Sequence, residues 1–153
     1  MSSIKCIIAA GGLGTRLQGF RDNQSTKILL KVNSKPMIIQ QLEQLISWGL
    51  NDFVIITNPS FDKLIKEETN QIREKYNIDY AIQPEQLGIS HALKQASSYV
   101  NDDDQVVFVL GDNFFGNNPL GNIDFDELLS TNKNSIIFTK EVINPEEFGV
   151  AVV

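Results

Sequence analysis

Residues 4–17 read IKCIIAAGGLGTRL, a buried-strand pattern that ends abruptly in a glycine-rich loop. The apolar, β-branched run 4–10 predicts a strand buried on both faces. Glycines directly after a strand let the backbone turn sharply and bring its N–H groups close to a ligand. In an open α/β sheet, such a loop at the carboxyl end of a strand is a place where phosphate groups bind.

The loop matches neither common phosphate-binding fingerprint. It lacks the Gly-Lys-Ser/Thr ending of a P-loop, and a dinucleotide fingerprint counted from Gly12 would require glycine where Leu17 stands. It does contain Arg16, and a guanidinium grips phosphate oxygens bidentately and stays charged at any working pH. On these residues alone, a tight structural turn with an exposed arginine remains the alternative.

The rest of the chain alternates between strand-like and helix-like segments. We expect a helix over 37–48, opened by Pro36 and ended by Gly49, a second from a Ser60 cap to about 76, a third over 89–100 and a short one near 125–129. Strands are expected over 53–57, 78–82, 105–110 and 135–142, and an apolar run follows at 149–153. This alternation with short connections predicts an α/β fold, a Rossmann-like doubly wound, mainly parallel sheet with flanking helices.

Composition and charge narrow the class of protein. The 153 residues are 42% hydrophobic and 21% charged, as in an ordinary soluble globular domain, and no apolar run suits a membrane span or a signal peptide, so we expect a cytoplasmic protein without a membrane partner. The net charge of −6 argues against nucleic acid as a partner. Residues 1–35 nevertheless hold six basic residues and one acidic residue. Such a segment either attracts a small polyanion or forms a solvated basic face.

Several single residues admit two interpretations. Cys6 is better explained as a small buried hydrophobe than as a catalytic thiol, and His91, the only histidine, as a residue on a helix face. Lys27 precedes an apolar run, where it either snorkels to water or meets an anion. Asp112 follows the strand at 105–110, as a turn residue or as a carboxylate for Mg²⁺. Gln83 either ends a strand or recognises a ligand.

Taken together, the motifs resemble the sugar-1-phosphate nucleotidyltransferase family, and within it the glucose-1-phosphate thymidylyltransferases. They are, in chain order, GGLGTRL at 11–17, Lys27 with the apolar residues after it, SKPMI at 34–38, QPEQLG at 83–88, LGDNFFG at 110–116 and NPEEFGV at 144–150. The resemblance extends from Ile4 to the last residue. The chain departs from the family pattern in two places: Gln18-Gly19-Phe20 follows GTRL, where members usually carry a proline soon after, and Lys31 stands where the usual Lys-x-Leu-Leu-Pro ends.

The resemblance implies a reaction and a role for each site residue. A sugar-1-phosphate oxygen would attack the α-phosphorus of dTTP or UTP, releasing pyrophosphate, and this nucleophile is already anionic, so no general base is required. The loop residues Ala10, Gly11, Gly12, Gly14, Thr15 and Arg16 would hold the triphosphate, and Lys27 would neutralise the pyrophosphate. Gln83 would bond the pyrimidine edge, Gly88 would let the base lie against backbone, Asp112 would bind Mg²⁺ and Gly149 would contact the sugar.

The organisation of the chain gives two further expectations. We expect residues 1–153 to form one nucleotidyltransferase nucleotide-binding domain, truncated at the carboxyl end because the sequence stops within the apolar run 150–153. An unpaired final strand would favour a homo-oligomer. The alternative function is a non-catalytic module, or a fragment, that binds a nucleotide or a nucleotide sugar.

Overall fold

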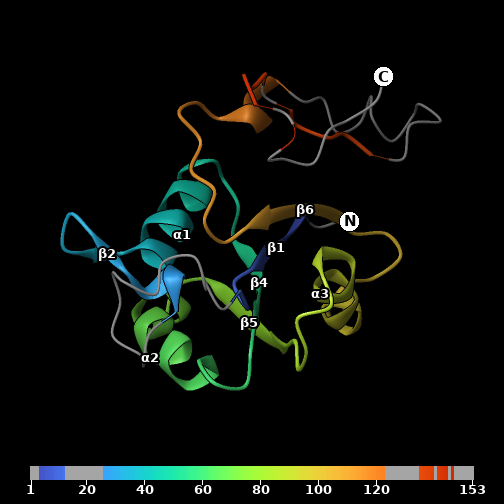
Figure 1. Cartoon of the computed structure of the whole chain (residues 1–153). Coiled ribbons are helices and arrows are strands. Elements are labelled where there is room, and N and C mark those ends of the chain that lie inside the picture. Colours follow the sequence, from blue (N-terminus) through green and yellow to red (C-terminus); the bar gives the residue numbers. More distant parts are fainter. Residues whose placement is uncertain (1–3, 13–25, 123–134, 140, 145, 147–153) are drawn as a thin grey trace. The chain divides into compact units, whose positions relative to one another are not determined.

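The computed structural model describes residues 4–12, 26–122, 135–139, 141–144 and 146. The chain divides into two compact units, residues 1–114 and residues 115–153. The first unit contains the sheet and its flanking helices (Figure 1), and each unit is described by itself.

The sheet of the first unit consists of four parallel strands in the order β5-β4-β1-β6. They are β1 (Ile4–Ala9), β4 (Asp52–Thr57), β5 (Asn77–Ile82) and β6 (Gln105–Leu110). The chain moves outward from β1 to β5 and then returns to place β6 on the other side of β1. The topology therefore switches between β1 and β6, and the pairing of Ala9 with Leu110 brings their carboxyl ends level. Open sheets bind ligands at such a switch point, and the predicted fold class is confirmed.

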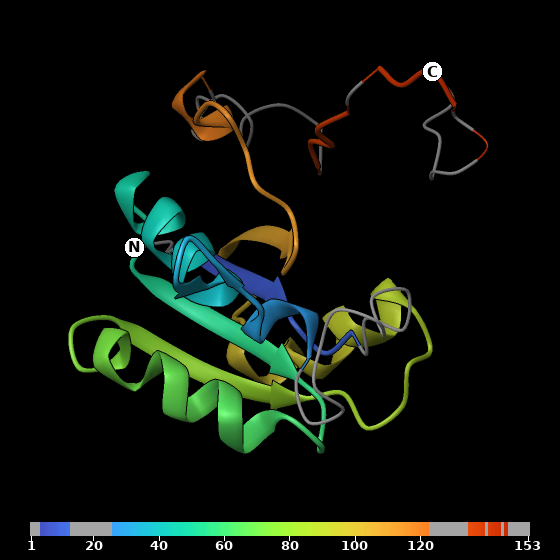
Figure 2. The same ribbon diagram turned by 60° about the vertical axis from the view of Figure 1, so that its left-hand side comes forward.

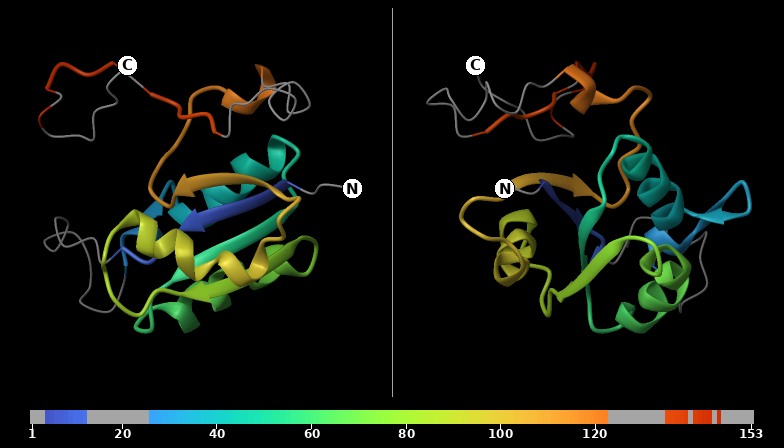
Figure 3. Two further views of the ribbon diagram at one scale, coloured as in Figure 1. Left: turned by 90° about the vertical axis from the view of Figure 1, so that its right-hand side faces the viewer. Right: turned by 180° about the vertical axis from the view of Figure 1, so that it is seen from behind.

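Helices cover both faces of this sheet, as Figures 2 and 3 show. One face carries α1 (Met37–Ser47) and α2 (Asp62–Arg73); the other carries α3 (Ile89–Gln95) and the 3₁₀ turn η3 (Ser97–Tyr99). On the α3 side, Ile7, Val54 and Ile56 pack with Ala92 and Ala96. Because side chains alternate across a strand, their buried neighbours point to the opposite face. That set comprises Cys6, Ile8, Phe53 and Ile55.

The ends of the helices test two sequence predictions. Gly49, with φ of +92°, donates its N–H to the carbonyl of Ile46 and ends α1 as expected. The predicted cap at Ser60 is wrong, because α2 begins at Asp62, its N-cap residue is Phe61 and no side chain caps it. Asn58 Oδ1 accepts the N–H groups of Ser60 and Phe61 at 2.9 and 3.1 Å.

Two further segments differ from their predicted form. The apolar run at Lys27 is strand-like in sequence but forms a short 3₁₀ turn, η2 (Lys27–Leu29). The chain continues into a hairpin of β2 (Lys31–Val32) and β3 (Lys35–Pro36). Asn33 and Ser34 both have positive φ there, as a tight hairpin turn requires. The helix predicted over 89–100 divides into α3 and η3. Apolar runs of three or four residues do not separate strand from turn.

The described part of the second unit contains the 3₁₀ turn η4 (Pro119–Asn122). The strand predicted over 135–142 is wrong at the described positions. Residues 135–139 are exposed and form no strand, because a strand needs a neighbouring strand to take up its backbone hydrogen bonds. The predicted helix at 125–129 and the apolar run at 149–153 lie outside the described residues. Among the described helices, none has the length and apolar character needed to cross a membrane.

Candidate nucleotide-binding site

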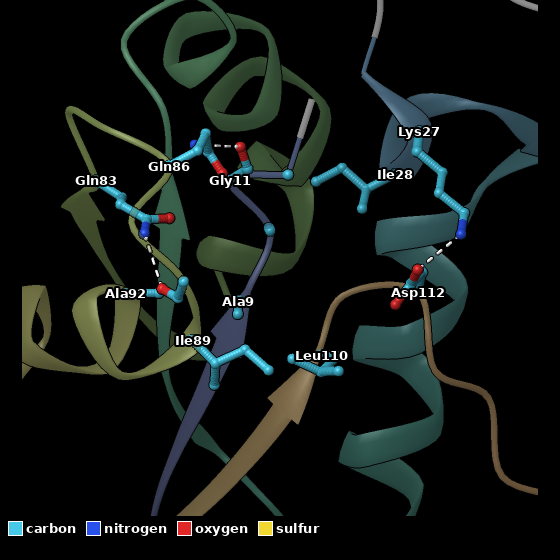
Figure 4. Close-up of a pocket in the computed structure, with 13 residues that line it drawn as sticks. Ala9, Gly11, Lys27, Ile28, Gln83, Gln86, Ile89, Ala92, Leu110 and Asp112 are labelled. Atoms are coloured by element: carbon cyan, nitrogen blue, oxygen red, sulfur yellow. Dashed lines mark hydrogen bonds and ion pairs between the residues drawn. The ribbon is translucent and has the colours of Figure 1, made fainter. Parts of the chain in front are cut away.

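A cavity of about 400 Å³ lies in the first unit, at the carboxyl ends of β1, β5 and β6 (Figure 4). Its lining comes from the glycine loop, from η2, from the segment between β5 and α3, and from the end of β6. The lining residues are Ala9, Ala10, Gly11, Gly12, Lys27, Ile28, Gln83, Gln86, Gly88, Ile89, Ala92, Leu110 and Asp112. The cavity thus lies at the switch point where such sheets bind ligands.

The floor of the cavity is the backbone that follows β1. The carbonyl of Gly11 accepts hydrogen bonds from Asn58 Nδ2 at 2.8 Å and from Gln86 Nε2 at 3.0 Å. A Cβ atom at Gly11 would lie 3.2 Å from Gln83 Oε1, so the close packing of this loop favours glycine. At Gly111, which follows β6, a Cβ atom would lie only 2.9 Å from the carbonyl of Ala9. The two loops at the switch point therefore approach each other backbone to backbone.

One side of the cavity, the amide wall, consists of Gln83, Gln86 and Gly88. Gln83 follows β5 and is 4% exposed, and its backbone N–H extends the sheet by donating to the carbonyl of Thr57 at 2.8 Å. Its Nε2 donates to the carbonyl of Gly88 at 3.2 Å. Gly88 has φ of +97°, a conformation that L residues with a Cβ rarely adopt. The wall thus presents backbone and amide groups rather than charge.

The opposite side, the charged wall, is the ion pair of Lys27 and Asp112. Lys27 Nζ lies 2.7 Å from Asp112 Oδ2, and the two side chains are 35% and 38% exposed. Figure 4 shows this pair across the cavity from Gln83 and Gln86. Thr26 is fully buried and donates its hydroxyl to the carbonyl of Gly12 at 3.0 Å, which places Lys27 beside the glycine loop. A cation and a carboxylate open to solvent beside a glycine loop suit a ligand that carries phosphates and a metal ion.

Gln41 fixes the turn that carries Asp112, and the sequence analysis missed it. From α1, its Nε2 donates to the carbonyl of Leu110 at 2.8 Å and to that of Asn113 at 2.9 Å. Gln41 is 1% exposed, and its Oε1 has no hydrogen-bond partner among the described residues. The signal in the sequence is a glutamine on the core face of an apolar helix, next to Leu42. A buried polar side chain at such a position is held there by specific bonds.

The structure gathers seven of the predicted site residues around this one cavity. They are Ala10, Gly11, Gly12, Lys27, Gln83, Gly88 and Asp112. Gly14, Thr15, Arg16 and Gly149 lie outside the described residues. Gln86 and Ile28 also line the cavity, and although both lie within the quoted motifs, the sequence analysis assigned them no role. Within the described part of the chain, no three His, Cys, Asp or Glu residues form a group able to hold a metal ion, so Asp112 is a single carboxylate ligand candidate.

The fold belongs to the class of open α/β sheets, which bind ligands at a topological switch point such as the one between β1 and β6. Comparison with known families gives a more specific assignment. Residues 5–153 match the Nucleotidyl transferase family, and the chain belongs to it. The resemblance inferred from the motifs is thereby confirmed.

Relatives and solved structures agree with this assignment. The chain is 34% identical to glucose-1-phosphate thymidylyltransferase of Neisseria meningitidis over 96% of its own length and 50% of the relative's. It is 30% identical to mannose-1-phosphate guanyltransferase of Emericella nidulans, covering 97% of this chain and 41% of that one. A Bacillus anthracis structure assigned as a glucose-1-phosphate thymidylyltransferase superposes with a TM-score of 0.68 at 31% identity, over 75% of this chain and 46% of that chain. The chain spans about half the length, or less, of the curated relatives it matches.

Proposed function

We propose that this chain is the nucleotide-binding part of an enzyme that transfers a nucleotidyl group from dTTP or UTP to a hexose-1-phosphate. The products are a nucleotide sugar and pyrophosphate. The observation that carries the proposal is the single cavity that combines a glycine floor, an amide wall and a Lys27–Asp112 pair. Each component suits a different part of a nucleoside triphosphate: backbone N–H groups and lysine suit phosphates, and amides suit a base edge.

Nucleotidyl transfer requires the site to position the two substrates and to stabilise the charge on their phosphate oxygens. A phosphate oxygen of the sugar-1-phosphate forms a bond to the α-phosphorus as the bond to the pyrophosphate oxygen breaks. The nucleophile is an anion, and the leaving pyrophosphate departs as one, so no proton has to move. Lys27 reaches the cavity beside the glycine loop, where its ammonium would balance the charge of the leaving group. Arg16 would add a second cation to the triphosphate.

Mg²⁺ is the metal that the donor set suits. Asp112 offers one carboxylate that is 38% exposed, and its Oδ1 is not the atom that contacts Lys27. Mg²⁺ binds through one or two carboxylates together with phosphate oxygens and water, so one protein ligand is sufficient. When bound, the ion would supply further neutralisation of the phosphate charge. Because the described residues contain no larger acidic group, Mg²⁺ would be bound jointly with the nucleotide.

The donor base and the sugar are the finer parts of the proposal. Gln83 would hydrogen-bond the base edge while Gly88 leaves room for the base against backbone, and Gly149 would contact the sugar. Relatives named for thymidylyl transfer and for guanylyl transfer both match the chain. Thymine, uracil and guanine all carry an N–H at the centre of their Watson–Crick edge, so a purine donor is the nearest competitor to dTTP and UTP.

A second candidate function is nucleotide or nucleotide-sugar binding without catalysis. Such a module would keep the cavity described above and would act on or through a partner.

The deciding experiment is pyrophosphate release by the 153-residue chain with Mg²⁺, glucose-1-phosphate and each nucleoside triphosphate in turn. Release with dTTP or UTP is the expected result and identifies the donor. Calorimetric titration with the same nucleotides runs in parallel. Binding without release would favour the non-catalytic module, and neither binding nor release would contradict both candidates.

A further inference from the structure

His91 lies behind the amide wall, where it contacts the side chain of Gln83. It belongs to α3, which begins directly after Gly88. Its Nδ1 lies 3.2 Å from Gln83 Nε2, and its Nε2 lies 3.2 Å from Gln95 Nε2. The ring is therefore placed between two side-chain amides, one of which lines the cavity.

The side-chain NH₂ group of Gln83 faces two atoms within the chain. An amide NH₂ has two N–H donors, and the oxygen is its only acceptor. Gln83 Nε2 faces the carbonyl of Gly88 and the ring nitrogen Nδ1 of His91, each at 3.2 Å, and Nδ1 accepts from it when the ring carries its hydrogen on Nε2. The amide oxygen points toward Gly11 and the cavity (Figure 4). A ligand in the cavity is thus offered an acceptor by this amide.

This arrangement constrains the ring. A neutral imidazole has one N–H, and which nitrogen carries it follows from the hydrogen bonds around the ring. Both Gln83 and Gln95 direct Nε2 at a ring nitrogen, and each Nε2 also faces a carbonyl, that of Gly88 and that of His91. One ring nitrogen carries hydrogen, so one of the two amides has to turn and present its oxygen to the ring.

Burial decides which amide turns. Gln83 is 4% exposed, whereas Gln95 is partly exposed on α3. A turned Gln83 would place its oxygen against the carbonyl of Gly88 in a buried site, and an unpaired buried polar group is costly. A turned Gln95 would give up one hydrogen bond, to the carbonyl of His91, at a site that water reaches. Gln95 is therefore the amide that turns.

We infer that His91, as its Nε2–H tautomer, fixes the amide of Gln83 and so sets which nucleobases the cavity accepts. With the oxygen fixed toward the cavity, the site favours bases with an N–H at the centre of the Watson–Crick edge: thymine, uracil and guanine. It disfavours cytosine and adenine, which present a ring nitrogen acceptor there. His91 is a positioning residue, because it acts through Gln83. This inference rests on the proposed function for its ligand, but the tautomer itself does not.

The tautomer is measured directly, since His91 is the only histidine. A long-range proton–nitrogen NMR spectrum of the full chain, labelled with ¹⁵N-histidine at mildly alkaline pH, reports one ring. The expected result is a protonated Nε2 and an unprotonated Nδ1. A dominant Nδ1–H form would overturn the inference whether or not the chain binds nucleotide.

Selectivity is measured by titrating the full chain with dTTP and CTP in the presence of Mg²⁺. We expect dTTP to bind at least about tenfold more tightly than CTP. In His91→Leu, which removes the ring acceptor, this ratio should fall about fivefold. Lys94→Leu, at an exposed position on the same helix, should keep the ratio. Equal affinity for dTTP and CTP in the unmodified chain, or an unchanged ratio in a folded His91→Leu, would refute the inference while leaving nucleotide binding intact.

Discussion

The two walls of the cavity are built on opposite principles. The amide wall is held by hydrogen bonds within the chain: Gln83 is 4% exposed, and the exposed Gln86 donates to the same Gly11 carbonyl that accepts from Asn58. The charged wall is one ion pair, more than a third exposed on average. An ion pair this open to water contributes about 0–1 kcal/mol to stability, whereas leaving a buried polar group unpaired costs about 1–3 kcal/mol.

The contrast separates function from stability within a single site. Lys27 and Asp112 balance each other's charge, and in the proposed function they would exchange that contact for phosphate and metal. The amide wall keeps its geometry, because its donors are already bonded within the chain. Substitutions should therefore affect the two walls differently, and the difference is measurable.

The largest expected effect is on chemistry at the charged wall. Lys27→Ala and Asp112→Ala should each lower pyrophosphate release about a hundredfold or more, because charge stabilisation is the main contribution the site makes. Their melting temperatures should stay within about 2 °C of the unmodified chain. Lys35→Ala is the matched control, since Lys35 is an exposed lysine in an ion pair with Glu43 and does not line the cavity. A loss of activity in Lys35→Ala equal to that in Lys27→Ala would contradict the proposal that Lys27 has a specific role in the reaction.

An intermediate effect is expected at Gln41, whose hydrogen bonds fix the turn that carries Asp112. Gln41→Met has a similar shape but no donor, so the turn from Leu110 to Asn113 loses both bonds from α1. We expect about a tenfold rise in the Mg²⁺ concentration needed for half-maximal nucleotide binding, with a smaller change in affinity at saturating Mg²⁺. Gln105→Met is the control, because Gln105 Oε1 is likewise buried without a partner but lies at the opposite end of β6. The same shift in both variants would mean that a general loosening of β6 is responsible.

The smallest expected effect is on the stability of the sheet, which is measured by the rate at which a thiol reagent labels the buried Cys6. Burial raises the pKa of the Cys6 thiol to about 12, so the unreactive thiol form persists in the folded chain well above pH 9. A thiol reagent at pH 8 should modify the native chain only as fast as it opens. Gln83→Ala should speed this labelling severalfold through lost stability, and Lys27→Ala should leave it unchanged. Equal acceleration in the two variants would contradict the division between the walls.

The same raised pKa predicts a pH dependence. The unfolded thiol ionises near 9 and the folded one near 12, so the stability from this group is complete below about pH 9 and declines as the pH rises toward 12. Urea titrations at pH 8 and pH 10 would measure this decline, and Cys6→Ala should remove it.

The parts of the site that could be predicted from sequence are those carried by short local patterns. The β1 strand with Gly11 and Gly12, and the β6 strand followed by Asp112, both combine a buried run with a turn, and both strands lie where the sequence placed them, β1 ending one residue early. Residues that act across the fold gave no such pattern. Gln41 bonds residues about 70 positions away, and Gln86 bonds a carbonyl 75 positions away.

Other errors have a local cause. Ser60 is a good cap by residue type, but Asn58, whose amide donates to the carbonyl of Gly11, accepts the N–H groups of Ser60 and Phe61 in the turn before α2, and the helix begins only at Asp62. The apolar residues after Lys27 are strand-like in sequence, but so short a run is also compatible with a turn, and Ile28 is buried in η2 at the cavity lining.

The two hydrogen bonds to the carbonyl of Gly11 couple ligand binding at the two parts of the cavity. This carbonyl accepts from Asn58, next to β4, and from Gln86, in the segment that precedes α3, so the glycine floor and the amide wall share one atom. A ligand that steadies either side steadies the other, and the ordering cost is met once for both. Thymidine and inorganic triphosphate, added as separate molecules, would then each bind more tightly in the presence of the other.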